Sequence, residues 1–162
     1  MKFSQFENII SSQRMNRYLI ACGNDTKKSM TLYRLNLRLS QEFYTIISCF
    51  EVALRNAINK NCTEKWKNDW LRESAKPNGI FIQNKCEFTA KMINDAIKIL
   101  NEYSHYKLIT ELGFGFWRYM FAPRQYHATK ISLAKIFPLK PKSIASKHYN
   151  NDYIYDQLEK IN

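Results

Sequence analysis

The chain has 162 residues, of which 45% are hydrophobic and 24% are charged, and it carries a formal net charge of +11. This length corresponds to one ordinary domain, and the composition excludes a disordered chain. No apolar run reaches the ~18 residues of a membrane-spanning helix, and no signal peptide is recognised, so we expect a cytoplasmic protein that does not enter a membrane.

The apolar spacing is helical along the first third of the chain. The stretch "SSQRMNRYLIACGND" predicts a short helix from about Ser12, which Gly23 stops, and Asp25 is then the expected N-cap of the next helix. That helix either runs unbroken to about Asn61 or divides at Ser40. One stripe of it is apolar, at spacings of three, four or seven residues: Leu32, Leu35, Leu39, Ile46, Phe50, Ala53 and Ala57.

The rest of the chain also favours helices. The stretch "TEKWKNDWLRESAKPNGIF" interrupts the periodicity and predicts a loop, and "GIFIQ" is the best strand candidate. Further helices are expected over 84–103, over 105–121 and over 124–137, and a last one begins at Asn151 or Asp152. We therefore expect one all-α domain over 1–162, a bundle of about five to seven helices.

The interval between Glu111 and Asp152 contains no acidic residue. Unneutralised positive charge attracts phosphate and releases its condensed counterions, so this interval predicts contact with nucleic acid. On one continuous helix, Arg124, His127 and Lys135 would share a face. A solvated basic face without a ligand, or a protein or lipid partner, are the alternatives. The candidate RNA-binding residues are Arg118, Arg124, His127, Lys130, Lys135, Lys140 and Lys142.

The cysteines and histidines do not form a metal-binding pattern. None of the four cysteines belongs to a C-x-x-C pair, and His105, His127 and His148 are scattered. We expect reduced thiols, no metal and no small-molecule cofactor.

The aromatic run Phe114–Trp117 has two interpretations. It could stack on unpaired bases, or it could pack the bundle interior. The second is favoured, with Gly113 and Gly115 allowing a neighbouring helix to come close.

Five segments in order resemble the Abi-like family of bacterial abortive-infection proteins. They are "RYLIACGND" at 17–25, "LYRLN" at 32–36, "FEVALRNAI" at 50–58, "ELGFGFW" at 111–117 and "FP" at 137–138. The resemblance covers most of the chain. It implies an all-helical fold of the HEPN type, used in RNA cleavage and phage defence, and such domains often dimerise.

In that family type, the motif is an Arg and a His with four to six residues between them, and two copies of the motif face each other to form one metal-independent ribonuclease site. This sequence has Arg55 and Asn56, but Lys60 stands five residues after Arg55 and no His is near. Lysine is a poor general base at neutral pH. The family's Arg-Asn-x-x-x-His motif is expected after a helix such as the last one here, so we expect the C-terminal part of the family pattern to be missing.

The expected function is therefore a phage-defence protein that binds or processes RNA, without a complete nuclease site. The first alternative is an active endoribonuclease using Arg55, Asn56 and a distant His, of which His127 or His148 are the options. The second is a non-catalytic interaction module, of the kind an antitoxin represents. Arg55-Asn56 is favoured as a polar contact within the bundle, with Arg55 near Glu51, one helical turn earlier, or against carbonyls of a neighbouring helix. A direct role at an RNA surface is the alternative.

Overall fold

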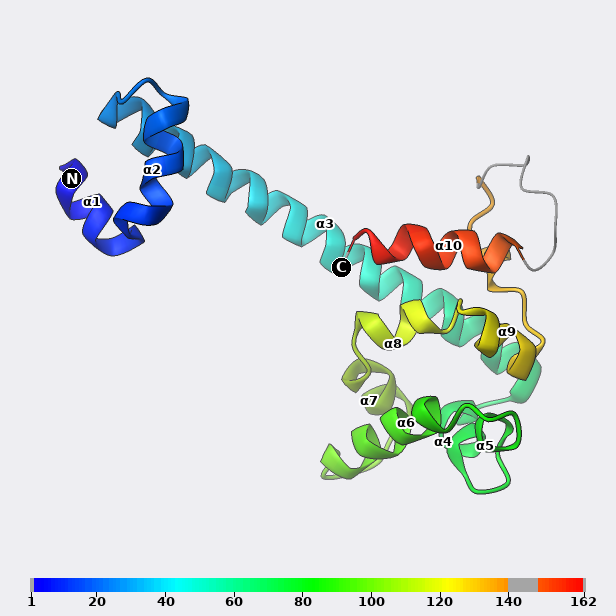
Figure 1. The fold of residues 1–162 in the computed structure, drawn as a ribbon. Coiled ribbons are helices and arrows are strands. Elements are labelled where there is room, and N and C mark those ends of the chain that lie inside the picture. The colour runs from blue at the N-terminus through cyan, green and yellow to red at the C-terminus, as the bar shows by residue number, and fades with distance from the viewer. Residues whose placement is uncertain (1, 140–148, 162) are drawn as a thin grey trace. The chain divides into compact units, whose positions relative to one another are not determined.

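The computed structural model describes residues 2–139 and 149–161, and these residues form helices and no strand (Figure 1). The all-α expectation is confirmed, although the described residues form more helices than the five to seven that were predicted. The elements are α1 (Phe3–Ile10), α2 (Ser12–Ala21), α3 (Thr26–Trp66), α4 (Trp70–Ala75), α5 (Ile80–Gln83), α6 (Glu87–Ile99), α7 (His105–Glu111), α8 (Phe114–Tyr119), α9 (Pro123–Thr129), the 3-10 helix η1 (Leu133–Ile136) and α10 (Tyr149–Glu159).

The contacts divide the chain into two compact units, 1–49 and 50–162. The physical reason lies in α3, which contributes to both units. Every residue from 34 to 46 is exposed, so this stretch of the helix adds nothing to either core. Each unit is described below by itself.

Unit 1 is built from α1, α2 and the first half of α3. Its small core consists of Phe6, Met15 and Tyr33, one from each helix. Gly23 ends the α2 region at a φ of 60°, a conformation that glycine adopts without strain. Asp25 caps α3 by accepting hydrogen bonds from the backbone N–H groups of Lys27 and Lys28 at 2.9 and 3.0 Å. Both signals were read correctly from the sequence.

Unit 2 contains the main core. Leu54, Ile58 and Cys62 come from one face of α3 and are buried among side chains of the later helices. Helices α4, α5 and α6 pack on one another, α6 packs on α7, and α10 packs on α8, α9 and η1. Phe116 and Trp117 belong to this core, which confirms the packing interpretation of the aromatic run.

Two predicted elements between α3 and α6 differ in the structure. The expected loop holds α4, and "GIFIQ" forms the short helix α5 instead of a strand. Gly79 precedes α5 because an added Cβ would lie 2.3 Å from the backbone oxygen of Ser74. No such close approach exists at Gly113 or Gly115, where an added Cβ would meet nothing within 4 Å.

The helix expected over 105–121 is divided into α7 and α8. The indole N–H of Trp117 donates a hydrogen bond to the Leu112 carbonyl at 2.7 Å, which satisfies a carbonyl that the broken helix leaves free. The helix expected over 124–137 is also broken, because Lys130 ends α9 with a φ of 52°. None of the described helices combines the length and the apolar character that crossing a membrane requires.

Candidate nucleic-acid interface

Three lysines from different elements meet at a groove of about 360 Å³ in unit 2. Lys65 stands in the last turn of α3, Lys130 follows α9, and Lys135 belongs to η1. Glu64 is the acidic residue among those that line the groove. Within the described residues, no ion pair neutralises Lys130 or Lys135, whose side chains are exposed, so the groove carries positive charge.

The backbone around Lys130 fixes the position of these cations. The N–H of Lys130 donates to the Tyr126 carbonyl at 2.8 Å, which closes α9. The N–H of Ile131 donates to the Thr129 hydroxyl at 3.2 Å. Lys65 adds a tertiary link, because its Nζ donates to the Thr129 carbonyl at 2.8 Å. The end of α3 is thereby tied to the end of α9. The partial negative charge at the C-terminus of α9 favours the ammonium group of Lys65 there.

The charges of two of these lysines also affect the pKa of the buried thiol of Cys62. Burial raises the pKa of Cys62 to about 12, while the charges of Lys65 and Lys135 act to lower it. The thiol is therefore an inert part of the main core. The two ammonium groups lie close enough to act on it electrostatically, which agrees with their position at one groove.

The other predicted RNA-binding residues are not all equivalent. Arg124 and His127 are exposed on α9, three residues apart. Lys135 does not continue their helical face, as the sequence predicted, because the helix ends before it. Arg118 has a side chain only 16% exposed, and its NH1 lies 3.0 Å from Oε1 of Glu159. Its charge is thus already paired.

Arg118 also stands 4.8 Å from the ring centre of Tyr155, a cation–π contact with α10. Lys140, Lys142 and His148 lie outside the described residues.

The predicted pairing of Arg55 with Glu51 is not observed. No ion pair within 4.0 Å joins these side chains in the part of the chain that is described. Arg55 is partly buried and its Nε has no hydrogen-bond partner, whereas Asn56 is exposed. Arg55 therefore keeps hydrogen-bonding capacity that the chain's described residues do not use.

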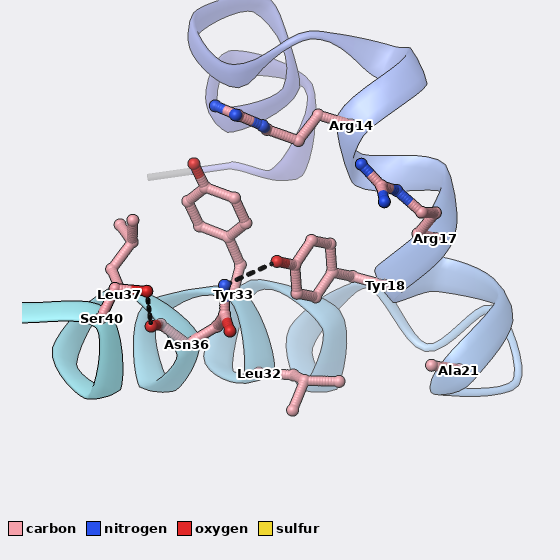
Figure 2. Close-up of a pocket in the computed structure, with 9 residues that line it drawn as sticks. All are labelled: Arg14, Arg17, Tyr18, Ala21, Leu32, Tyr33, Asn36, Leu37 and Ser40. Atoms are coloured by element: carbon pink, nitrogen blue, oxygen red, sulfur yellow. Dashed lines mark hydrogen bonds between the residues drawn. The ribbon is translucent and has the colours of Figure 1, made fainter. Parts of the chain in front are cut away.

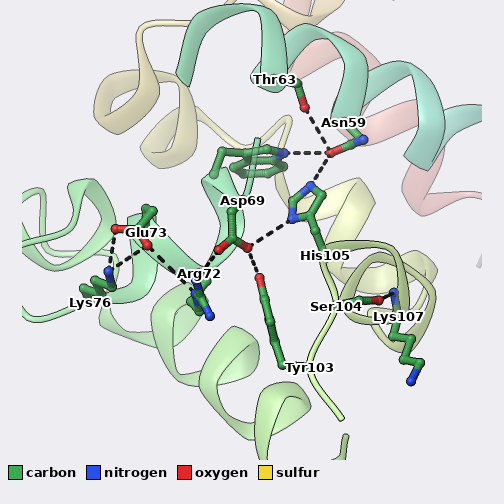
Figure 3. Close-up of polar contacts among 11 residues, drawn as sticks. Asn59, Thr63, Asp69, Arg72, Glu73, Lys76, Tyr103, Ser104, His105 and Lys107 are labelled. Atoms are coloured by element: carbon green, nitrogen blue, oxygen red, sulfur yellow. Dashed lines mark hydrogen bonds and ion pairs between the residues drawn. The ribbon is translucent and has the colours of Figure 1, made fainter. Parts of the chain in front are cut away.

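A second polar cluster, which the sequence did not reveal, joins Asn59, Asp69 and His105 (Figure 3). Asn59 Oδ1 accepts a hydrogen bond from the Trp70 indole at 2.8 Å and lies 3.0 Å from His105 Nε2. Since the indole can only donate, the amide oxygen must face it, and His105 Nε2 must therefore carry a proton. The Nδ1 atom of His105 faces Asp69 Oδ1 at 3.6 Å, longer than a hydrogen bond.

Asp69 is held by two further side chains. Its Oδ2 lies 2.6 Å from Arg72 NH2, and its Oδ1 accepts a hydrogen bond from the Tyr103 hydroxyl. Arg72 also covers the Tyr103 ring at 4.3 Å. Burial lowers the pKa of His105 from its usual 6.5, although the Asp69 carboxylate acts in the opposite direction.

This cluster contains a His–Asp pair, which can serve as a general base. Here Nε2 donates its proton to Asn59, and the unprotonated Nδ1 is buried and faces the Asp69 carboxylate, so the ring offers a substrate no accessible basic nitrogen. The cluster therefore ties α3 to the start of α7 and to the turn before α4. Among the described residues, no group of His, Cys, Asp or Glu side chains could hold a metal ion.

The chain matches no protein-family model, no curated protein and no solved structure at a significant level. Function is therefore inferred from the chain's own residues.

Proposed function

We propose that this chain is an RNA-binding protein of bacterial phage defence, of the abortive-infection type and with a HEPN-type fold. The groove between Lys65, Lys130 and Lys135 contacts the RNA phosphates. The observation that carries the proposal is the convergence of these three lysines at one groove, beside a chain interval with no acidic residue. A cytoplasmic location, where bacterial RNA is found, belongs to the same proposal.

The chemistry of the groove suits a phosphate backbone better than a base edge. Lysine is a compact charge that contacts phosphate without requiring one fixed geometry. Each phosphate neutralised by such a charge releases counterions, so affinity depends on salt and little on sequence. Arg124, exposed on α9, adds a further positive charge to the surface of unit 2.

The resemblance, and not the groove, supplies the link to phage defence. The groove does not by itself support RNA cleavage. The catalytic candidates Arg55 and Asn56 belong to α3, whereas His127 belongs to α9. We accordingly propose binding without a complete nuclease site. An active metal-independent endoribonuclease and an antitoxin-like interaction module are the alternatives.

The test is RNA binding by the pure full chain, measured by fluorescence anisotropy with a labelled single strand. Lys130→Glu/Lys135→Glu should weaken binding by about ten-fold or more, because two attractive charges become repulsive. Lys91→Glu/Lys160→Glu, two exposed lysines that do not line the groove, is the control with an equal change of charge.

If both double variants lose affinity equally, net charge and not the groove binds RNA. RNA cleaved by the wild type in the presence of EDTA, and not by Arg55→Ala, would instead support the endoribonuclease. No binding of any RNA at low salt would leave the interaction module as the better proposal.

A further inference from the structure

Unit 1 contains a hollow of about 520 Å³ between α2 and α3 (Figure 2). Arg14, Arg17 and Tyr18 line it from α2, and Tyr33, Asn36 and Ser40 line it from α3. Two of the segments that carry the family resemblance, 17–25 and 32–36, thus meet here. The volume falls in the range of small-molecule sites.

The tyrosine side of the hollow is fixed by contacts within unit 1. Asn36 Nδ2 donates a hydrogen bond to the Tyr18 hydroxyl at 3.0 Å. The ring of Tyr33 meets the rings of Phe6 and Tyr18 edge to face, at 5.5 and 5.1 Å between centres. The aromatic wall is therefore preorganised, which lowers the entropy that a ligand must lose on binding.

The opposite side of the hollow carries positive charge. Arg14 and Arg17 are exposed, and in the described part of the chain neither is in an ion pair. Figure 2 shows both guanidinium groups extending from α2 toward the side on which Tyr33 lies. No acidic residue lines the hollow. Two guanidinium groups beside aromatic rings suit a ligand that joins a phosphate to a planar ring.

We propose that this hollow binds a nucleotide phosphate, with the phosphate on Arg14 and Arg17 and the base against Tyr18. The ligand is either a free mononucleotide or the 5′-phosphate end of a single-stranded RNA. This site lies in unit 1 and does not depend on the lysine groove of unit 2.

Calorimetric titration of the full chain tests this site, with adenosine 5′-monophosphate, adenosine and inorganic phosphate as probes. The monophosphate should bind at least about ten-fold more tightly than adenosine, because only it meets both guanidinium groups. A short RNA with a 5′-phosphate, compared with the same RNA carrying a 5′-hydroxyl, distinguishes the two sources. Arg14→Gln/Arg17→Gln should abolish the preference for the phosphate.

Lys2→Gln/Lys27→Gln removes two charges from the same unit, outside the hollow, and should leave monophosphate binding unchanged. The groove variant Lys130→Glu/Lys135→Glu should also leave it unchanged, so the two proposals fail separately. The proposed site is overturned if the monophosphate does not bind. It is also overturned if the arginine and lysine double variants lose affinity for the monophosphate equally.

A different observation concerns the exposed part of α3. Five large apolar side chains lie along one stripe of this helix, and between 38% and 63% of each residue is exposed. They are Leu32, Leu35, Leu39, Phe43 and Ile46. A contiguous exposed patch of this kind marks an interaction surface. Tyr33 and Ile58, which enter the two cores, belong to another face of α3, whereas Phe50, which continues the stripe, is partly buried against the main core.

The spacing of the stripe is the same in both directions from Leu39, at four and then three residues. A second copy of the helix, turned end to end about Leu39, would therefore place Leu35 against Phe43 and Leu32 against Ile46. Such a contact is self-complementary, as a two-fold dimer requires.

The charged residues beside the stripe favour an antiparallel arrangement of the two helices. Arg38 and Glu42 stand on one edge of it, exposed and, in the described residues, without an ion pair. In an antiparallel pair this edge faces the same edge of the partner, and Arg38 comes within about one helical turn of Glu42 of the partner subunit. In a parallel pair it would face the uncharged edge of Asn36 and Ser40, and both charges would stay unpaired.

The family resemblance already implies a dimer, and we infer that the stripe of α3 is its interface and that the two helices are antiparallel. Its apolar length, residues 32–46, is about 21 Å, so the contact is small and the association concentration-dependent. Sedimentation equilibrium of the full chain should show a reversible dimer of the 19.3 kDa chain. Leu39→Glu, which places two carboxylates at the two-fold axis, should make it monomeric. Tyr44→Glu, exposed on another face, should leave the dimer intact.

A charge exchange tests the direction. Arg38→Glu should weaken the dimer several-fold, because it then faces Glu42 of the partner subunit, and adding Glu42→Arg should restore it. A wild-type chain that stays monomeric at about 100 µM, or a Leu39→Glu chain that still dimerises with its helices intact by circular dichroism, overturns the inference. If Arg38→Glu weakens the dimer and adding Glu42→Arg does not restore it, the antiparallel arrangement is overturned.

Discussion

His105 Nε2 lies 3.0 Å from Asn59 Oδ1, although 46 residues separate the two in sequence. The same oxygen accepts the indole N–H of Trp70. One amide on α3 therefore orients two ring side chains from later elements, and one of them, Trp70, belongs to the main core.

Asn59→Ala should lower the free energy of unfolding by about 1–3 kcal/mol, because two partly buried donors lose their acceptor. Urea unfolding followed by tryptophan fluorescence measures this change. Asn56→Ala, an exposed asparagine on the same helix, is the control and should change stability little. Equal effects of the two substitutions would show that the polar cluster adds nothing specific.

The stability of the protein should depend on pH through His105. Burial lowers its pKa in the folded chain below the usual 6.5, so the unfolded chain binds the proton more readily. The free energy of unfolding should therefore fall as the pH drops below about 6.5, and level off once the pH is below the folded pKa. His105→Gln should remove this part of the pH dependence. A mutant with the wild-type profile would assign the dependence to other groups.

The thiols should react at very different rates. Cys49 is exposed, whereas burial raises the pKa of Cys62 to about 12 and also raises the pKa of Cys86. At pH 8 a thiol reagent should label Cys49 first and reach Cys62 and Cys86 only on unfolding. Mass spectrometry of the labelled peptides measures the order. Rapid labelling of Cys62 in the folded chain would contradict its place in the core.

Arg118 should act mainly through stability. Its contacts with Glu159 and Tyr155 join α8 to α10, so Arg118→Gln should cost about 0.5–2 kcal/mol of unfolding free energy. RNA affinity per folded molecule should change less than in a Lys130→Gln variant. A larger loss of RNA affinity in Arg118→Gln would place the RNA on the α8–α10 side.

Local signals in the sequence were sufficient where one residue determines the backbone. Gly23 stops a helix and Asp25 starts the next, because each acts on its nearest neighbours in the chain. The unbroken form of α3 was one of two options left open. The sequence did not predict α1, whose apolar side is completed only by packing Phe6 against Tyr33.

Tertiary contacts determined what the sequence could not show. The break between α7 and α8 is stabilised by the Trp117 indole on the Leu112 carbonyl, and no spacing rule contains that contact. The left-handed conformation of Lys130 separates Lys135 from Arg124, so the three residues expected on one helical face, Arg124, His127 and Lys135, come from two elements. Lys65, the third lysine of the groove, was not predicted because it lies far from the acid-free interval in sequence.

The salt dependence of RNA affinity tests the central claim most directly. Plots of log affinity against log salt concentration should be less steep for Lys130→Gln/Lys135→Gln than for the wild type. The slope should change by about 1.4, because each phosphate contact on a single strand contributes about 0.7. Lys91→Gln/Lys160→Gln, with the same net charge, should keep the wild-type slope. Equal slopes for the wild type and the groove variant would contradict a phosphate-binding groove at Lys130 and Lys135.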